Sequence, residues 1–137
     1  MLNTVRSVFD IAIHLMDAQN AATGGTDTAD TREYALRTPS LINSLLDRVY
    51  RFSDTFAAGE KGKRGVCRKV SAMEDVLDLD EGICTAVLPY GLAALLLSEE
   101  NPSLANFFYG TFVTELREFG VALAAEIEPV EDVYGGI

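Results

Sequence analysis

The stretch that decides the fold is ICTAVLPYGLAALLL, residues 83–97. Only Thr85 interrupts its apolar character, so the stretch predicts a helix that lies in the centre and is covered from several directions. It is shorter than the ~20 residues that span a bilayer, and it contains Pro89 and Gly91, which predict a bend in a buried helix. Asp80 and Glu81 predict the start of this helix, because negative charges are stabilised at the positive N-terminal end of a helix dipole.

Two more helices are predicted before this central one. Apolar residues recur at helical spacing from about residue 3 to residue 20, with Asn3 as the expected N-cap. A second stretch runs roughly from residue 27 to residue 52, with Thr28 or Asp30 as the cap and Glu33 three residues after Asp30. Pro39 lies inside this second stretch, so a kink or a break is expected near Thr38.

A further helix is predicted after the central one. Asn101 followed by Pro102 is a strong helix start, and Pro129 is the expected end. The side expected to be buried comprises Leu104, Phe107, Phe108, Phe112, Leu116, Phe119 and Leu123.

Residues 53–79 interrupt this helical pattern. Their glycines sit among charges, and the weak alternation of VCRKV at 66–70 predicts a loop or a small hairpin. The predicted fold class is therefore mainly α. It is a helical bundle of about four helices over residues 1–126, with a loop or small β-hairpin insertion at about 53–79 and an extended C-terminal tail at 127–137.

Charge is unevenly distributed along the 137 residues, whose formal net charge is −10. Residues 1–73 carry ten Lys and Arg against eight Asp and Glu, whereas residues 74–137 carry thirteen acids and one base, Arg117. An acidic chain cannot hold nucleic acid by neutralising phosphates. The insertion nevertheless contains a basic cluster: Lys61, Lys63, Arg64, Arg68 and Lys69. These residues predict either a solvated loop or a contact with an acidic protein or with passing DNA.

A search for chemistry in the sequence favours a non-enzymatic protein. Cys67 and Cys84 have no CxxC spacing and are expected to be buried reduced thiols of a cytosolic product. His14 is the single histidine, without an identifiable catalytic partner. Paired acids near Asp75 and Asp80 are expected to be solvated or to cap helices, and their spacing does not match a calcium loop. No cofactor, metal or phosphate-binding motif is recognised, and the N-terminus lacks the pattern of a signal peptide.

The overall pattern resembles a known family. The segments DTADTREY (27–34), RTPSLINSLL (37–46), YGLAALLL (90–97) and ANFFY (105–109) are similar to those of head–tail connector proteins, also called adaptor or head-completion proteins, of tailed bacteriophages and prophages. The similarity covers most of residues 3–125. Helix content and spacing contribute more to it than any single motif.

The resemblance implies a virion protein of the phage neck, present in the host cytoplasm during assembly. Such a subunit forms a homo-oligomeric ring, usually a dodecamer, beneath the portal protein, where it extends the DNA channel and contacts a stopper or tail-completion protein. DNA passes through without specific binding, and no membrane is involved. The basic insertion departs from the simplest members, and its role could be to face the channel or the next neck component.

The C-terminal tail is expected to dock on the portal or on a neighbouring subunit, because an extended segment can add to a sheet edge or fill a groove. Its apolar residues are Val130, Val133, Tyr134 and Ile137. One alternative to the neck protein is a small helical regulator that binds a transcription factor or an enzyme as a dimer. A second alternative is a nucleic-acid-binding module in which the basic loop dominates the acidic body.

Overall fold

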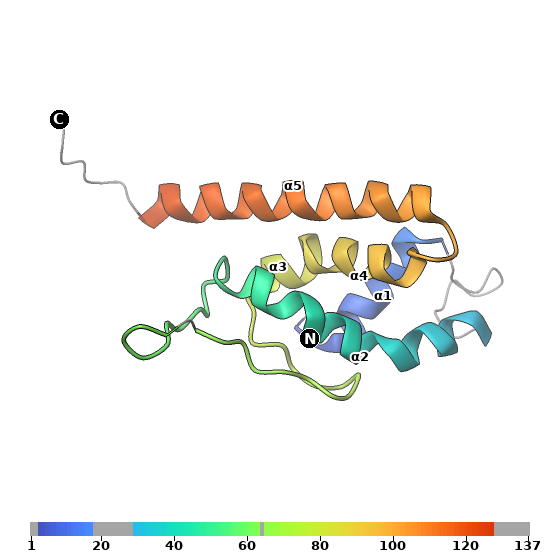
Figure 1. Ribbon diagram of the computed structural model, residues 1–137, viewed down its shortest axis with the longest axis horizontal. Coiled ribbons are helices and arrows are strands. Elements are labelled where there is room, and N and C mark those ends of the chain that lie inside the picture. Colours follow the sequence, from blue (N-terminus) through green and yellow to red (C-terminus); the bar gives the residue numbers. More distant parts are fainter. Residues whose placement is uncertain (1–2, 18–28, 64, 128–137) are drawn as a thin grey trace.

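The computed structural model describes the backbone of residues 3–17, 29–63 and 65–127, and the side chains of these residues up to position 120. Within these ranges the chain is mainly helical, as predicted, and Figure 1 shows the arrangement. The helices are α1 (Val5–Leu15), α2 (Ala29–Tyr50), α3 (Glu81–Ala86), α4 (Leu88–Leu97) and α5 (Pro102–Ile127). The long helix α5 runs over α3 and α4, while α1 and α2 lie on the other side of them (Figure 1).

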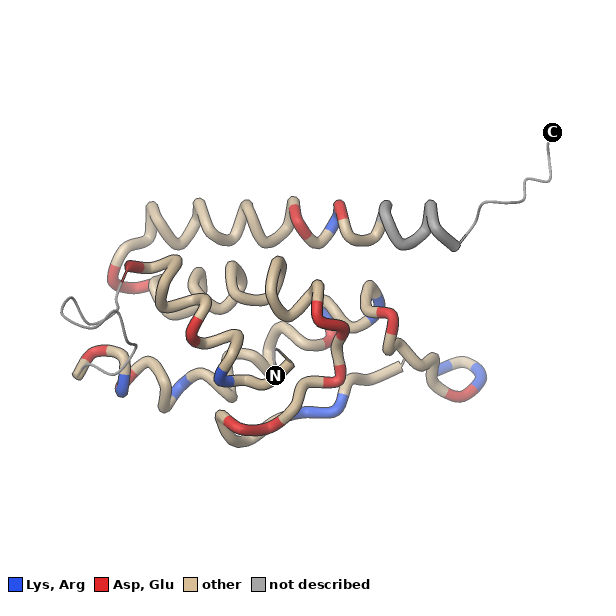
Figure 2. Tube along the Cα trace, turned by 180° about the vertical axis from the view of Figure 1, so that it is seen from behind, with Lys and Arg blue, Asp and Glu red and all other residues tan. Residues whose placement is uncertain are grey.

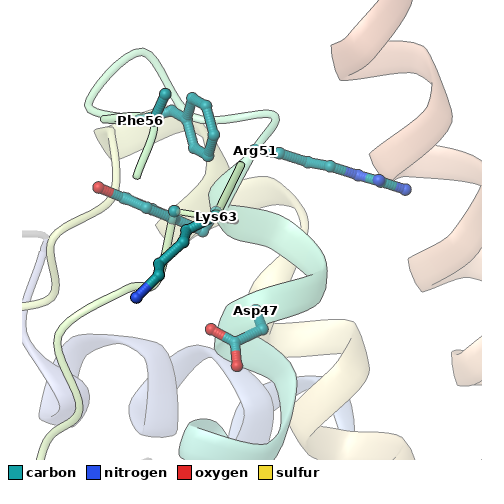
Figure 3. A pocket seen from close by; sticks show the side chains of 7 residues that line it. Asp47, Arg51, Phe56 and Lys63 are labelled. Carbon is teal, nitrogen blue, oxygen red and sulfur yellow. The ribbon is translucent and has the colours of Figure 1, made fainter. Parts of the chain in front are cut away.

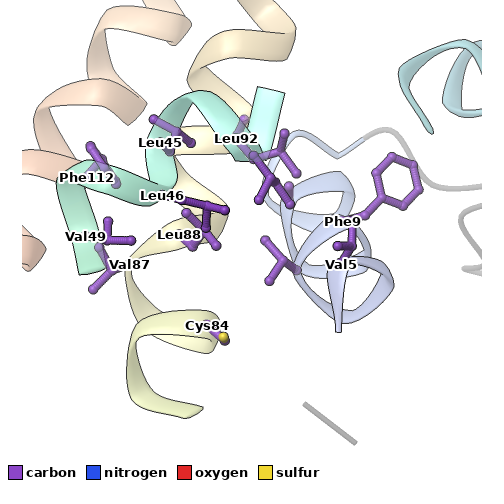
Figure 4. Packing of buried hydrophobic residues seen from close by; sticks show 14 of the residues in the cluster. Val5, Phe9, Leu45, Leu46, Val49, Cys84, Val87, Leu88, Leu92 and Phe112 are labelled. Atoms are coloured by element: carbon purple, nitrogen blue, oxygen red, sulfur yellow. The ribbon is translucent and has the colours of Figure 1, made fainter. Parts of the chain in front are cut away.

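The central helix of the bundle is α4, which contacts all four other helices. Its residues are apolar around the whole circumference, and Leu88, Leu92 and Ala93 have no solvent exposure. Figure 4 shows Leu45 and Leu46 from α2, Phe9 from α1 and other buried side chains packed in this core. The predicted central position of this stretch is confirmed, and burial of these apolar side chains is the main stabilising contribution to the fold.

The predicted single helix over this stretch is two helices, separated at Val87. Pro89 has no backbone N–H and its ring crowds the carbonyl four residues earlier, that of Thr85, which disfavours a continuous helix at this point. Pro89 instead occupies the first turn of α4, where the missing donor is not needed. The start of α3 agrees with the prediction: the side chain of Asp80 accepts a hydrogen bond of 2.8 Å from the backbone N–H of Ile83.

Gly91 allows the neighbouring helices to close on α4. A Cβ atom at this position would lie 2.9 Å from Phe112 on α5 and 3.0 Å from Leu45 on α2. Both distances are at or below the limit of normal carbon contacts, so any larger residue would push the helices apart.

The N-cap of α1 is Thr4 and not the predicted Asn3. The hydroxyl oxygen of Thr4 accepts a hydrogen bond of 3.2 Å from the backbone N–H of Ser7. Asn3 has a tertiary contact instead, because its side-chain amide donates to the carbonyl of Leu79 at 3.0 Å. The local sequence pattern that suggested Asn3 as the cap contains no signal for this long-range hydrogen bond.

Helix α2 continues through Pro39, so the break expected near Thr38 does not occur. Thr38 is fully buried, and its hydroxyl donates to the carbonyl of Tyr34 at 2.9 Å. Packing of this segment against the core outweighs the lost hydrogen bond, as tertiary context often does. Helix α5 begins as predicted, since the side chain of Asn101 accepts a hydrogen bond of 3.2 Å from the N–H of Leu104.

The insertion between α2 and α3 is a loop with no strand among its described residues, and its one β-bridge joins Val76 to Thr4. The carbonyl of Asp75 accepts a 3.0 Å hydrogen bond from the N–H of Val5 at the start of α1. Val70 is held by Asn43 of α2, whose amide donates to the Val70 carbonyl at 2.7 Å and accepts from its N–H at 2.9 Å. The loop alternative is therefore the observed one, and polar contacts with α1 and α2 secure its second half.

Candidate interaction surfaces

The basic cluster of the insertion divides into two parts. Lys69 forms a salt bridge of 3.1 Å with Asp47 of α2, and the guanidinium of Arg68 donates to the carbonyl of Val76 at 3.2 Å. Lys61 and Lys63 are exposed. Figure 2 shows a loop with blue segments at one end of the molecule. The fifth predicted residue, Arg64, lies outside the described residues.

A surface pocket of about 330 Å³ lies where the insertion folds back on the end of α2 (Figure 3). It is lined by Asp47, Tyr50, Arg51, Phe56, Ala58, Lys63 and Gly65. The lining thus combines two aromatic rings with the charged groups of Lys63 and Asp47, while the guanidinium of Arg51 stacks over Phe52 and points away from Phe56 and Lys63 (Figure 3). Of the predicted site residues, the structure brings Lys63 to this pocket.

Tyr50 holds the start of the insertion where it folds back over the end of α2. Its hydroxyl accepts a hydrogen bond of 3.0 Å from the backbone N–H of Ala57, and its ring packs edge-on against Phe56 with centroids 5.0 Å apart. Gly65 approaches the carbonyl of Ala57 so closely that a Cβ atom would lie 2.2 Å from the oxygen. Only glycine fits this contact, which explains one of the glycines in the insertion.

The first half of α5 presents an uncharged outer face. No charged residue occurs between Pro102 and Thr114, and Figure 2 shows this part of the helix without blue or red segments. Phe107 is 64% exposed, and a Cβ atom added to Gly110, one turn further on, would meet nothing. The prediction that Phe107 is buried is therefore wrong. Phe108, about 100° further around the helix, occupies the core side instead.

Arg48 joins α2 to this helix by donating a hydrogen bond to the hydroxyl of Tyr109. One edge of the outer face thus carries the charge of Arg48, while the part around Phe107 is uncharged. Large exposed aromatic side chains of this kind are typical of protein–protein contacts.

The two cysteines are buried free thiols, as predicted. Burial raises the pKa of Cys84 to about 12, and it also raises the pKa of the Cys67 thiol. Both groups therefore stay protonated near neutral pH, and a thiol is a poor nucleophile in that form. His14 is exposed, and its Nδ1 lies 2.8 Å from the carbonyl oxygen of Asp10 within its own helix.

The paired acids have structural roles. Asp80 caps α3, and it also accepts a hydrogen bond of 3.0 Å from the backbone N–H of Asp54. Asp75 caps a turn by accepting hydrogen bonds from the N–H groups of Ser71 and Ala72 at 2.8 and 2.9 Å, which lower the pKa of its carboxyl group. Over the described parts of the chain, no cluster of His, Cys, Asp and Glu is arranged to hold a metal ion.

A second pocket, acidic in character, lies at the start of α2. It is lined by Asp30, Glu33, Tyr34 and Glu100, and has a volume of about 260 Å³. Tyr34 donates its hydroxyl proton to Glu100 at 2.5 Å. Burial, followed by this carboxylate, raises the pKa of Tyr34 to about 12. The contact joins α2 to the turn before α5, and sequence spacing alone did not indicate it.

The predicted docking residues of the tail, Val130, Val133, Tyr134 and Ile137, lie outside the described residues. Sequence analysis also did not identify Arg51, Phe56 or Tyr50 as members of a site. These residues come together only because the insertion folds back across the last turn of α2, and no local pattern encodes that fold-back.

In comparisons with known proteins, the chain matches no protein-family model, no curated protein and no solved structure. Among the helices that the structure describes, none combines the length and apolar character that a bilayer crossing requires. The surfaces described above are therefore the basis for a functional proposal.

Proposed function

We propose that this protein is a structural subunit of a phage neck, which assembles with copies of itself and links a portal protein to a stopper or tail-completion protein. The proposal combines the resemblance to head–tail connectors with the exposed uncharged face of α5. In this proposal the subunits form a ring and the protein is a component of the virion. The number of twelve copies is the one that the family resemblance implies.

The single observation that carries the proposal is the uncharged face around Phe107 on a protein of net charge −10. Copies with the same charge repel one another, so they approach most easily where charges are absent. A head-to-tail ring needs two different surfaces on each subunit. The uncharged face of α5 and the basic insertion differ in chemistry and lie on different elements, as such an interface requires.

The acidic second half of the sequence supports a role around DNA that is not a binding role. A channel lining that repels phosphates lets DNA slide, whereas clustered Lys and Arg would retain it. In this proposal the C-terminal tail contacts the portal or the neighbouring subunit, and the basic insertion faces the next neck component instead of the channel.

Co-expression with the portal protein encoded in the same genome tests this proposal. Electron microscopy and native mass spectrometry are expected to show a ring of this chain on the portal. Phe107→Glu places a charge at the centre of the uncharged face and is expected to abolish that ring while the variant keeps its helical circular dichroism. If the protein does not bind the portal and forms the same dimer under all conditions, the alternative of a small helical regulator would be supported instead.

A further inference from the structure

The pocket at the end of α2 has the chemistry of a peptide-binding site. Phe56 and Tyr50 provide its aromatic wall, and Lys63 provides a positive charge. The guanidinium of Arg51 stacks over the ring of Phe52, 5.4 Å from its centroid, and points away from Phe56 and Lys63 (Figure 3). Its one carboxylate, Asp47, is already paired with Lys69. The charge that remains for a ligand is therefore positive, and Phe56 keeps 41% of its surface exposed. A ligand that carries acids next to an apolar or aromatic side chain fits this combination.

One segment of this chain has that composition. Residues 126–137 read EIEPVEDVYGGI and contain four acids and no base. Glu131 and Asp132 directly precede Val133 and Tyr134, so two carboxylates adjoin an aromatic side chain. The insertion has the opposite composition, with five Lys and Arg against one Glu over residues 59–69.

The end of α5 brings this segment close to the pocket. Helix α5 ends at Ile127 on the same end of the molecule as the insertion (Figure 1). Gly120 packs against the ring of Phe52, the neighbour of Arg51, with a Cβ position 2.7 Å from that ring. The helix extends roughly 10 Å beyond Gly120. The seven residues that follow Ile127, up to Tyr134, can span at most about 25 Å, which is enough to return to the pocket.

We propose that this pocket binds the acidic–aromatic segment 131–134 of the same chain. Tyr134 packs against Phe56 in the pocket, and the carboxylate of Asp132 faces Lys63. A tethered segment has a high effective concentration, so a weak contact suffices to keep the pocket occupied. The contact belongs to the free chain before any assembly and does not depend on the proposed function. In an assembled neck the tail would leave the pocket to contact the portal or a neighbouring subunit.

Fluorescence of the full chain tests this contact, because the protein contains no tryptophan. Tyr134→Trp introduces a single indole reporter into the segment. We expect emission at shorter wavelength than that of the urea-unfolded variant, and several-fold weaker quenching by acrylamide. The signal should not change with protein concentration, since the contact is intramolecular, and it should weaken at high salt because charge pairs are screened.

Exchanging the charges of Lys63 and Asp132 tests whether this pocket is the binding partner of the segment 131–134. Adding Lys63→Glu to the reporter variant should expose the indole, and further addition of Asp132→Lys should restore its protection. Lys61→Glu is the matched control: it removes the same charge from the same loop at a residue that does not line the pocket, and should leave the emission close to that of the reporter variant. Phe56→Ala should expose the indole without a charge change.

Three results would overturn the proposal. The first is an indole that is fully exposed in the reporter variant. The second is protection that Lys63→Glu and Phe56→Ala do not alter. The third is protection that disappears on dilution, which would place the segment on a second copy instead of its own chain.

Discussion

The core around α4 and the insertion between α2 and α3 are held by different forces. In the core, Leu88, Leu92 and Phe112 are almost completely removed from water, and burial of apolar area provides the stability. In the insertion, single polar contacts such as the paired bonds between Asn43 and Val70 fix the chain. Burial is distributed over many side chains, whereas each polar contact fixes one point. A change in the core is therefore expected to affect the whole fold, and a change in the insertion to act locally.

The largest effect is expected for Phe112→Ala. The ring is 1% exposed and packs beside Gly91, so its removal leaves a cavity and should lower the free energy of unfolding by about 3–5 kcal/mol. Urea denaturation followed by circular dichroism measures this. Phe107→Ala, on the outer face of the same helix, is the control and should change stability by less than about 0.5 kcal/mol. Equal losses for the two variants would contradict the assignment of the two faces.

A smaller loss is expected for Gly91→Ala. The added methyl group would meet Phe112 and Leu45 at 2.9 and 3.0 Å, and should destabilise the protein by about 1–3 kcal/mol. Gly110→Ala is the matched control in a helix, since its methyl group meets nothing, and it should stabilise by about 0.5–1 kcal/mol. Thermal unfolding of both variants gives the sign of each change, and a stabilising Gly91→Ala would rule out close packing at α4.

Asn43→Ala tests how the insertion is held, because it removes both hydrogen bonds to Val70. The loss of global stability should be about 1–2 kcal/mol, because a buried backbone group loses its partner. Hydrogen exchange should accelerate at residues 66–76 more than in α4. Ser44→Ala, next to it on the exposed side of α2, should leave exchange in the insertion unchanged. Uniform acceleration across the molecule would show that the insertion is part of the core's cooperative unit.

The smallest effect near neutral pH concerns Cys84. Its pKa is raised by burial from 9.0 to about 12, so the folded protein keeps the thiol proton where the unfolded chain loses it. This contribution to stability is complete below pH 9 and declines as the pH rises from 9 towards 12. Cys84→Ala should therefore flatten the decline of the melting temperature in this alkaline range. A parallel decline in both proteins would exclude the thiol as its cause.

Local signals in the sequence predicted the helices well and their tertiary partners poorly. Asp80 and Asn101 cap helices as expected, because capping involves groups only three residues apart. Asn3 and Phe107 were misassigned because their surroundings depend on distant segments: Leu79 accepts the amide of Asn3, and α4 packs on Phe108. The sequence predicted a bend at Pro89, and the structure has a break between α3 and α4 at Val87, two residues earlier. Pro89 is the cause of the predicted bend and of the observed break.

The basic insertion shows the same limit for the candidate sites. Its five cations form one cluster in the sequence, but the fold pairs Lys69 with Asp47, and only Lys63 lines the pocket with Arg51 and Phe56. The cluster identified a positively charged segment of the sequence. It could not predict the pocket, because the other members come from α2 and from the other side of the fold-back.

The sequence by itself determined the helical class, the buried central stretch and the ends of several helices, because periodicity, capping and proline act over a few residues. Only the tertiary structure decided which aromatic residue of α5 faces water, that α2 continues through Pro39, and how the insertion closes on Tyr50. These outcomes depend on contacts between residues far apart in the chain, whose energies exceed local preferences and leave no local pattern.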